Sequence, residues 1–417
     1  MKMGTDMESY WDTEDRNPHP FYDALRARGD VVWDNHIKAW LVTGAAANRA
    51  VLMDDSTYIQ PYLSMKAGEG YRALRLNNPR SFHFLTGEEH RAMHRWWLMD
   101  LLSPQWVAEY MDTVVTPIIG RILSSLEGRE EFDIADEYAE RIPVAIFADL
   151  MDLPDRTTET LARIKKLNDR IADFATIANS LKLEGEPTDE LLAVQRSAIA
   201  ASEELNEMLR PVVEERKERR GEDFVSRLWA GGPALYEDWN STDVLDASRR
   251  LLFAGSDTTT LSIANAFYML LTDESLLQQV RAGGRPAIAK FVEEVLRLNG
   301  SVQFRPRRAM KDVELAGQKI AKGDMVIAVL QAANRDPAHF ACPHVVNLDR
   351  KAIRAHFAFN VGPRSCPGSN LARAELVESI AQMLNRYTTI RLVNPGEPVL
   401  RGFMFRSYRP LHVAVSG

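Results

Sequence analysis

The 417-residue sequence contains few cysteines and no long apolar segment. Only Cys342 and Cys366 are present, which excludes a site with four cysteine ligands and a framework of several disulfides within one chain. No apolar run is long enough to cross a bilayer, and the polar, acidic segment 1–16 has the pattern of neither a signal peptide nor a membrane anchor. We therefore expect a cytoplasmic protein without a membrane anchor.

Positive charge is also in short supply. The chain has 51 Lys and Arg residues against 58 Asp and Glu residues, which gives a formal net charge of −7. This balance argues against a protein that binds nucleic acid over a broad basic surface. The hydrophobic share of 45% and the charged share of 26% are typical of a folded globular protein.

Local patterns predict a helix-rich chain with a smaller β-rich part. Segments 30–33 and 38–43 have the pattern of a β-hairpin, and segment 45–53 that of a helix. A long helix is expected to begin at 241–243 and to end near Leu271, and its apolar residues extend nearly all round, which predicts burial at the centre. No linker divides the chain. We predict one mainly α domain over residues 1–417, with β-rich parts at about 30–60, 300–330 and 390–417 and helical parts at about 85–300 and 367–387.

The strongest motif surrounds the second cysteine and runs from Phe359 through Gly362, Arg364 and Cys366 to Gly368. Apolar residues recur at helical spacing directly after it, so a helix is expected there. A cysteine at a helix N-terminus is expected to form a stabilised thiolate. One soft, anionic ligand suits an iron whose other ligands come from a macrocycle. The alternative is a buried, unreactive cysteine in a turn.

The spacing Phe-x-x-Gly-x-Arg-x-Cys-x-Gly resembles that of the haem-thiolate monooxygenases, the cytochrome P450 family, of the bacterial type without a membrane anchor. The resemblance covers the chain from about Pro18 to Val413. It implies the cytochrome P450 fold with the long central helix over haem b, Cys366 as the iron ligand, and O2 as co-substrate. Electrons would come from NAD(P)H only indirectly, through a separate ferredoxin or flavodoxin with its reductase. Candidate docking cations for that partner are Arg91, Arg95 and Arg373.

A second motif, from Ala254 through Gly255 to Asp257, Thr258 and Thr259, falls within the predicted long helix. The glycine and the two threonine hydroxyls are expected to weaken the helical hydrogen-bond ladder and to widen one turn. The resemblance implies that Thr258 hydrogen-bonds dioxygen during its activation and that Asp257 relays protons from solvent. The alternative is a kinked helix with a polar pair facing solvent.

Further residues follow from the same resemblance. Glu294 and Arg297 form a Glu-x-x-Arg pattern that the family buries, whereas the same pair on a surface would contribute little. The haem propionates are expected to contact Arg307 and Arg364. The family's His-x-x-x-Arg pattern is represented here by His90 and His94, and Arg95 and Arg305 are alternatives to His94. For each arginine the alternative is a solvated surface charge.

The substrate pocket implied by the resemblance is mostly apolar, which predicts a small to medium-sized hydrophobic substrate. Arg250 is an exception on the long helix. It would suit a carboxylate of the substrate, although we favour an ion pair with Asp246, four residues earlier. The predicted pocket residues are Phe84, Arg250, Phe253, Ala254, Gln303, Phe304, Phe403 and Met404.

These observations predict a monooxygenase that hydroxylates, epoxidises or demethylates its substrate. A haem-thiolate enzyme that uses peroxide, or that needs no oxygen, is the alternative. The Asp257–Thr258 pair argues against it, because such relatives usually lose the pair. A haem-binding protein without catalytic activity is a third hypothesis. A proton relay beside a broad apolar pocket argues against it, because such a protein would need neither.

Overall fold

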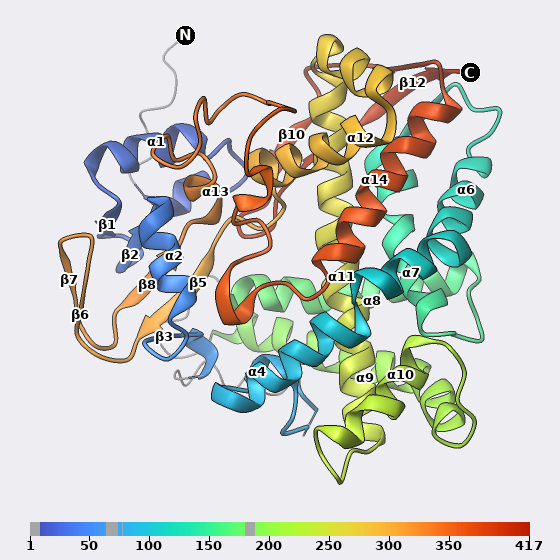
Figure 1. Cartoon of the computed structure of the whole chain (residues 1–417), viewed down its shortest axis with the longest axis horizontal. Coiled ribbons are helices and arrows are strands. Elements are labelled where there is room, and N and C mark those ends of the chain that lie inside the picture. The colour runs from blue at the N-terminus through green and yellow to red at the C-terminus, as the bar shows by residue number, and fades with distance from the viewer. Residues whose placement is uncertain (1–8, 64–73, 77, 180–187) are drawn as a thin grey trace.

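The computed structural model describes residues 9–63, 74–76, 78–179 and 188–417. Helices form most of the molecule, and the larger sheet lies on one side of it, together with the N-terminal helices (Figure 1). The structure is therefore mainly helical with a small β-rich lobe, as the sequence predicts.

The helices of the described residues vary widely in length. The longest is α11, which a short connection joins to α10. Helix α14 follows the cysteine motif. Their bounds are α1 (His19–Arg28), α2 (Ala45–Met53), α4 (Gly87–Trp96), α5 (Pro104–Tyr110), α6 (Thr116–Ser124), α7 (Arg141–Leu150), α8 (Thr158–Asn179), α9 (Asp189–Glu218), α10 (Phe224–Gly231), α11 (Ser241–Leu271), α12 (Glu274–Asn299), α13 (Leu330–Ala333) and α14 (Ser369–Arg386).

Helix α11 is the central element of the helical lobe. Its first turn is stabilised by Asn240, whose side chain accepts a hydrogen bond from the backbone N–H of Thr242, while the Asp243 carboxylate accepts one from the backbone N–H of Asn240. The helix packs against α7, α8, α9, α12 and α14, and most of its side chains are buried. The predicted bounds and central burial of this helix are confirmed.

The larger sheet joins parts of the chain that are far apart in sequence. Its strand order is β1-β2-β8-β5-β3, with β1 and β2 antiparallel and β2 and β8 parallel. The predicted hairpin and the β-rich parts near 30–60 and 300–330 thus form one sheet. The strands are β1 (Val31–Asp34), β2 (Ala39–Val42), β3 (Tyr58–Ile59), β5 (Arg305–Ala309) and β8 (Met325–Ala328).

Three smaller sheets complete the described structure, and one of them corrects the prediction. Strand β4 pairs with the C-terminal β12, although its residues fall in the region that we predict to be helical. The strand has only three residues, too few for a periodic signal, and its partner lies at the other end of the chain. The strands are β4 (Glu131–Asp133), β6 (Val313–Leu315), β7 (Gln318–Ile320), β9 (Thr389–Leu392), β10 (Val399–Arg401), β11 (Ser407–Arg409) and β12 (His412–Ser416).

The segment between α13 and α14 runs through the middle of the molecule, between the β-rich lobe and α11 (Figure 1). It carries the cysteine motif, so the fold places this motif where the two lobes meet. Among the helices of the described ranges, none combines the length and the apolarity that a bilayer crossing requires.

Candidate functional site

The cysteine motif forms a tight loop before α14. The 3-10 helix η10 (Gly362–Arg364) sits within it, and the backbone N–H of Cys366 donates to the Phe359 carbonyl at 2.8 Å. Gly362 has a φ of 76° and lies so close to α2 that an added Cβ would be 2.9 Å from the Leu52 carbonyl oxygen. The motif thus fixes the backbone so that Cys366 lines a cavity of about 300 Å³.

The surrounding protein alone does not favour the thiolate form of Cys366 that the sequence predicts. The sequence predicts a thiolate stabilised by the following helix. Burial instead raises the pKa of the Cys366 thiol, and this exceeds the opposing effects of the Gly368 backbone N–H and of two arginines. Helix α14 begins only at Ser369, which weakens the helix dipole at the sulfur. A thiolate at Cys366 therefore requires a cation bound to the sulfur, such as an iron ion.

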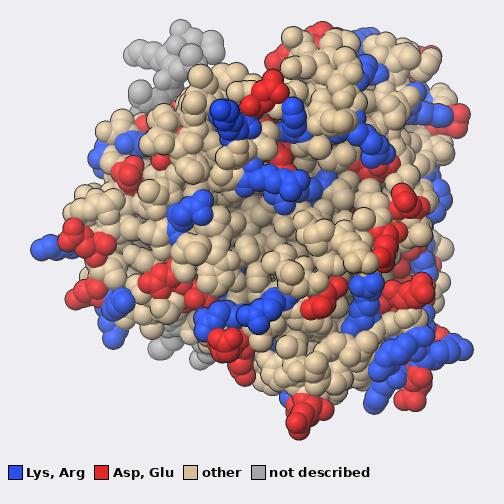
Figure 2. Space-filling model, viewed as in Figure 1, with Lys and Arg blue, Asp and Glu red and all other residues tan. Residues whose placement is uncertain are grey.

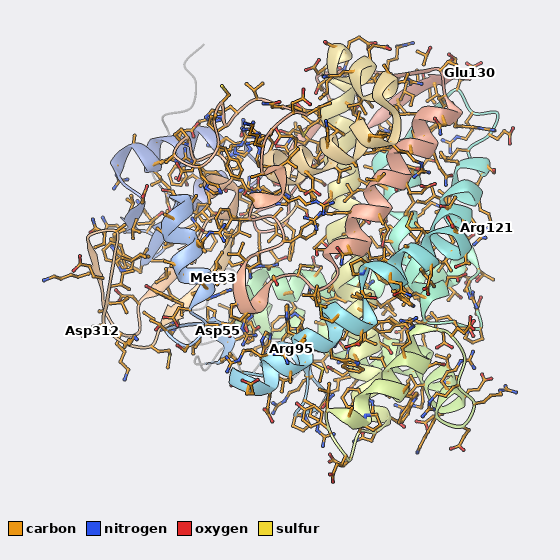
Figure 3. The ribbon with its side chains drawn as sticks, viewed as in Figure 1. Met53, Asp55, Arg95, Arg121, Glu130 and Asp312 are labelled. Carbon is orange, nitrogen blue, oxygen red and sulfur yellow. The ribbon has the colours of Figure 1, made fainter. Side chains whose placement is uncertain are left out.

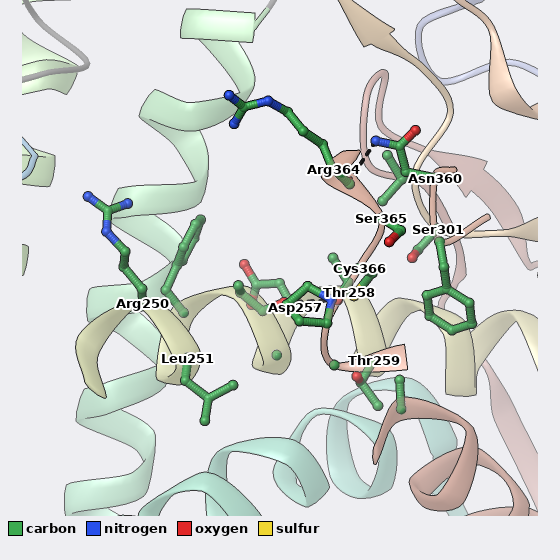
Figure 4. A pocket seen from close by; sticks show the side chains of 18 of the residues that line it. Arg250, Leu251, Asp257, Thr258, Thr259, Ser301, Asn360, Arg364, Ser365 and Cys366 are labelled. Atoms are coloured by element: carbon green, nitrogen blue, oxygen red, sulfur yellow. Dashed lines mark hydrogen bonds between the residues drawn. The ribbon is translucent and has the colours of Figure 1, made fainter. Parts of the chain in front are cut away.

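The segment of α11 that carries Asp257 and Thr258 lines the same cavity as Cys366 (Figure 4). The Thr258 hydroxyl donates to the Ala254 carbonyl at 3.0 Å. The expected widening of the helix is wrong, because α11 continues as an α-helix through this segment. Gly255 serves packing instead: an added Cβ would be 2.1 Å from Cζ of Phe147 on α7.

Asp257 is poised to exchange a proton near neutral pH. Burial raises its pKa to about 6, with Lys165 and Arg409 opposing and Asp169 and Glu140 reinforcing the shift. Its Oδ1 atom is buried and has no hydrogen-bond partner among the described residues. The side chain lies between the cavity, which it lines, and charged groups on α8 whose side chains are partly exposed.

Two arginines of low exposure in the cavity wall donate no hydrogen bond to a carboxylate of the described residues. Arg307 is only 3% exposed, and its guanidinium donates to the neighbouring Pro306 carbonyl at 2.8 Å. Arg364 donates to the Leu85 carbonyl at 2.9 Å, and its ion pair with Asp55 is long, at 3.7 Å. Burial lowers the pKa of both arginines, that of Arg307 to about 10. Buried cations need anionic partners, and the two propionates of haem would supply them.

The two histidines of α4 also line this cavity. His90 is 2% exposed, its Nδ1 atom has no partner among the described residues, and burial lowers its pKa to about 3. His94 Nε2 donates to the carbonyl of Ser365, beside Cys366, at 2.7 Å. Arg95 is instead exposed on the outer face of α4 (Figure 3) and does not line the cavity. Arg305, the other alternative, does line it.

These observations test whether the residues present fit a haem group. One thiol faces the cavity with no other cysteine near it. Arg307 is buried and the Arg364 side chain is 8% exposed, so two arginines are available for two propionates. A buried imidazole nitrogen has no partner within the described ranges. The donor set of one sulfur and several cationic groups matches a dianionic macrocycle with a thiolate-bound metal, so the residues fit haem.

Glu294 and Arg297 are both completely buried on α12. The guanidinium donates twice to Glu294, at 2.7 and 2.8 Å, and to backbone carbonyls of Asn334, Pro343 and Val345. All five of its N–H groups therefore have acceptors. Burial alone would raise the pKa of Glu294, but the hydrogen bonds from Arg297 and from Arg350 bring it below its ordinary value.

The predicted substrate-pocket residues divide into two groups. Arg250, Phe253, Ala254 and Met404 line the cavity, whereas the structure places Phe84, Gln303, Phe304 and Phe403 outside it, which corrects the prediction.

The four misplaced residues are held by other contacts. Phe304 and Phe403 pack on each other and on Tyr10, with ring centroids 5.2 to 5.3 Å apart. Gln303 is buried and donates to the Gly300 carbonyl, and Phe84 packs edge-on against Tyr62. Met404 and Phe403 belong to the same hydrophobic cluster as Tyr10, and of the two only Met404 also lines the cavity. Phe403 packs on Tyr10, which is far from it in the sequence, so no local pattern predicts this contact.

Glu375 is a cavity residue that the sequence does not lead us to predict. Glu375 on α14 is completely buried, neither carboxylate oxygen has a partner among the described residues, and burial raises its pKa to about 8. Its signal is an acidic residue within the apolar face that Leu371, Ala372 and Leu376 form. Phe82 stacks on His90, with ring centroids 5.1 Å apart, and His83 lies beside Arg250. Both belong to the 3-10 helix 82–84, directly before the predicted pocket residue Phe84.

Comparisons with known proteins agree with this geometry. A model of the family described as cytochrome P450 matches residues 13–407. The chain is 27% identical to the biotin biosynthesis cytochrome P450 of Bacillus subtilis, over 95% of this chain and 93% of the relative. It is 28% identical to the cytochrome P450 monooxygenase PikC of Streptomyces venezuelae, over 93% and 89%.

Solved structures show the same fold. P450BioI, in complex with acyl carrier protein ligated to hexadec-9Z-enoic acid, superposes with a TM-score of 0.81 at 25% identity, over 96% of this chain and 99% of that one. P450epoK bound to epothilone D superposes with a TM-score of 0.82 at 23% identity, over 96% of each chain.

Proposed function

The chain belongs to the cytochrome P450 family of monooxygenases, and from that premise we propose that it hydroxylates, epoxidises or demethylates a small to medium-sized hydrophobic molecule at the cavity lined by Cys366. The family implies haem as the cofactor. The observation that carries the proposal is that Cys366 and the Asp257–Thr258 pair line one cavity although more than 100 residues separate them.

Cys366 would bind the iron of haem b, and the propionates would contact Arg307 and Arg364, with His90 and His94 beside them. When bound, haem supplies the one-electron and oxygen chemistry, with O2 as co-substrate. Arg307 would keep its charge beside a propionate because burial lowers its pKa only to about 10, well above neutral pH. Burial also lowers the pKa of Arg364.

Asp257 and Thr258 would deliver protons within the cavity. A carboxyl group whose pKa is about 6 exchanges its proton readily near neutral pH, as a general acid requires. The Thr258 hydroxyl donates to the Ala254 carbonyl, and rotation of its hydrogen turns the donor toward the cavity. Protons would enter from the side of α8, where Lys165 lies 3.8 Å from Glu140.

The cavity wall next to these groups favours an apolar substrate. Phe253, Ala254, Leu251 and Val302 contribute apolar surface, and Met404 adds a flexible side chain that adapts to substrates of varied shape. The apolar wall excludes water from around the substrate.

Electrons would reach haem from a ferredoxin or flavodoxin, which takes them from NAD(P)H through its reductase. Lys and Arg side chains lie around the middle of the face on which α4 and α14 are seen (Figure 2). Arg95 is exposed there, and Arg91 is 47% exposed beside Glu88. Arg373 is a weaker candidate, because it is bound to Glu293 at 2.7 Å. An acidic partner protein would match Arg91 and Arg95.

The substitution Thr258→Ala tests the proton-delivery role. We expect the dissociation constant of the substrate to change by less than about twofold, since one small polar group is lost at the cavity wall. It is measured through the spin-state change of the haem spectrum. The share of consumed oxygen that appears as oxygenated product should fall severalfold, with peroxide released instead. The measurement pairs oxygen uptake with product formation in the presence of a ferredoxin system.

Thr260→Ala is the matched control, since Thr260 is on the same helix but bonds to the Ala139 carbonyl and does not line the cavity. Its coupling should equal that of the wild type. Unchanged coupling in Thr258→Ala would contradict the assigned role.

A further inference from the structure

Arg250 brings a positive charge to the wall of an otherwise apolar part of the cavity. It lies four residues before Ala254 and eight before Thr258 on α11, so the three residues share one face of the helix. Figure 4 shows its side chain rising from the same side of α11 as Asp257. A helix rises 1.5 Å per residue, which sets Arg250 about 12 Å from Thr258 along the axis.

The predicted ion pair with Asp246 is present, but it does not neutralise Arg250. Asp246 accepts from Arg250 Nε at 2.7 Å and from Arg249 Nη2 at 2.7 Å. The side chains of Asp246 and Arg249 are each 4% exposed, and that of Arg250 is 12% exposed. Two arginines therefore share one carboxylate in a buried setting, and one positive charge remains in excess.

The remaining contacts of the two arginines are with uncharged groups. Arg249 does not line the cavity, and it donates to Asn206 Oδ1 at 2.7 Å and to the Leu74 carbonyl at 2.9 Å. Arg250 Nη1 lies 3.2 Å from His83 Nδ1. Burial and the adjacent Arg250 hold the pKa of His83 well below its usual range, so the imidazole is neutral and accepts this bond. The excess charge is therefore located at Arg250.

One end of the Arg250 guanidinium is without a partner. Its Nη2 atom is buried and has no hydrogen-bond acceptor among the described residues. Hydrogen bonds at Nε and at Nη1 hold the group in place, and the Phe84 ring centroid lies 5.7 Å from its Cζ atom. Nη2 has none of these hydrogen bonds and belongs to a side chain that lines the cavity. An unsatisfied donor on a buried cation is costly, and an anion in the cavity would relieve both the missing bond and the excess charge.

We propose that Arg250 binds the anionic group of the substrate, a carboxylate or a phosphate, at the end of the cavity remote from Thr258. This inference rests on the proposed function and names the substrate class of the same site. The substrate is then an amphipathic acid. Its charged end is anchored by a charge-assisted hydrogen bond, and its apolar body runs along the α11 face toward Cys366. The anchor also determines which carbon atom is oxidised, because it fixes the distance between the charged group and the reacting end.

The test compares an acid with its uncharged ester on the haem-loaded protein. Decanoic acid and methyl decanoate are titrated at pH 7.5, and binding is followed by the haem spin-state spectrum and by calorimetry. Wild type should bind the acid about tenfold more tightly than the ester, the effect of one charge-assisted hydrogen bond. Arg250→Leu should weaken binding of the acid about tenfold and change binding of the ester less than about twofold.

Two further variants isolate the charge. Arg250→Lys keeps a cation and should retain part of the preference for the acid. Arg210→Leu removes an arginine of α9 that is 47% exposed and paired with Glu207, and should bind acid and ester as wild type does. Equal binding of acid and ester by wild type would overturn the proposal, as would an unchanged preference in Arg250→Leu. The wild-type comparison decides even where a variant folds poorly.

A separate reading distinguishes failure of this inference from failure of the proposed function. The spectrum of the reduced protein with carbon monoxide is recorded on the same samples. A red-displaced Soret band shows thiolate ligation whatever the acid does. Its presence without a preference for the acid would overturn only the role of Arg250.

Discussion

Two buried polar regions of this molecule differ in how completely their groups are paired. Around Glu294 on α12, every N–H of Arg297 has an acceptor, and the carboxylate accepts from Arg297, Arg350 and the Asn347 backbone. Along the cavity wall, the buried atoms Arg250 Nη2, His90 Nδ1, Asp257 Oδ1 and both oxygens of Glu375 have no partners among the described residues.

The difference separates structural from functional polar groups. A buried polar group that is fully paired can be explained by the fold alone. An unpaired one costs stability, and the four residues just named all line one cavity. The cavity wall is therefore preorganised for ligands, whereas the Glu294 cluster locks the segment that leads to the cysteine loop.

Breaking the fully paired region should have the largest effect. Glu294→Ala leaves Arg297 and Arg350 buried without their carboxylate, and we expect a loss of about 3–5 kcal/mol in the free energy of unfolding, together with loss of haem. Denaturant titration and haem content measure both. Lys290→Ala on the same helix removes an exposed pair with Asp349 and should cost less than about 1 kcal/mol. A Glu294→Ala protein as stable as this control would show that the cluster is not structural.

Glu375, in the unpaired region, should make protein stability depend on pH in the opposite sense from a carboxylate that accepts hydrogen bonds. Burial raises the pKa of Glu375 from 4.5 to about 8, so the folded state keeps a proton that the unfolded state has lost. Wild-type stability therefore falls as pH rises through this window, by about 1.4 kcal/mol per unit.

Glu375→Gln has no such proton. Its advantage over wild type should grow by about 3 kcal/mol between pH 5.5 and 7.5, measured by urea denaturation at each pH. A constant difference between the two proteins across this range would contradict the assignment.

The smallest effect is expected from the close packing of Gly255 against Phe147 in the cavity wall. Gly255→Ala forces a Cβ against the Phe147 ring, which stands 2.1 Å from its position, and should destabilise the protein by about 1–3 kcal/mol. Phe147→Leu in the same protein should restore part of the loss. Gly120→Ala on α6 is the control, because its Cβ would meet only the flexible end of Gln382 at 3.4 Å. A thermal melt in which both glycine variants behave alike would contradict the close packing.

The sequence carries much of this arrangement because its main motifs are local. The cysteine loop and the segment around Asp257 are each contained within about ten residues, and α11 has a start signal at 241–243 followed by apolar residues nearly all round the helix. Their placement on one cavity follows from the family resemblance. The Glu294–Arg297 pair could be located in the same way, but its burial depends on the surrounding fold.

What the sequence could not supply depends on distant partners. Phe304 and Phe403 are apolar like true cavity residues, yet they pack on the N-terminal Tyr10. The protonation of Cys366 depends on burial, which outweighs the local helix end. The incomplete pairing of Arg250 appears only when Arg249 and His83 are placed around it.

The central claim is that the thiol of Cys366 binds the iron of haem in the cavity that the unpaired groups surround. The most direct measurement is the absorbance spectrum of the reduced protein under carbon monoxide, for wild type and for Cys366→Ser, with Cys342→Ser as the control for the exposed cysteine. Wild type and Cys342→Ser should show the red-displaced Soret band of thiolate-ligated haem, and Cys366→Ser should lack it. A wild-type protein that takes up no haem, or a Cys366→Ser protein that keeps the band, would contradict the claim.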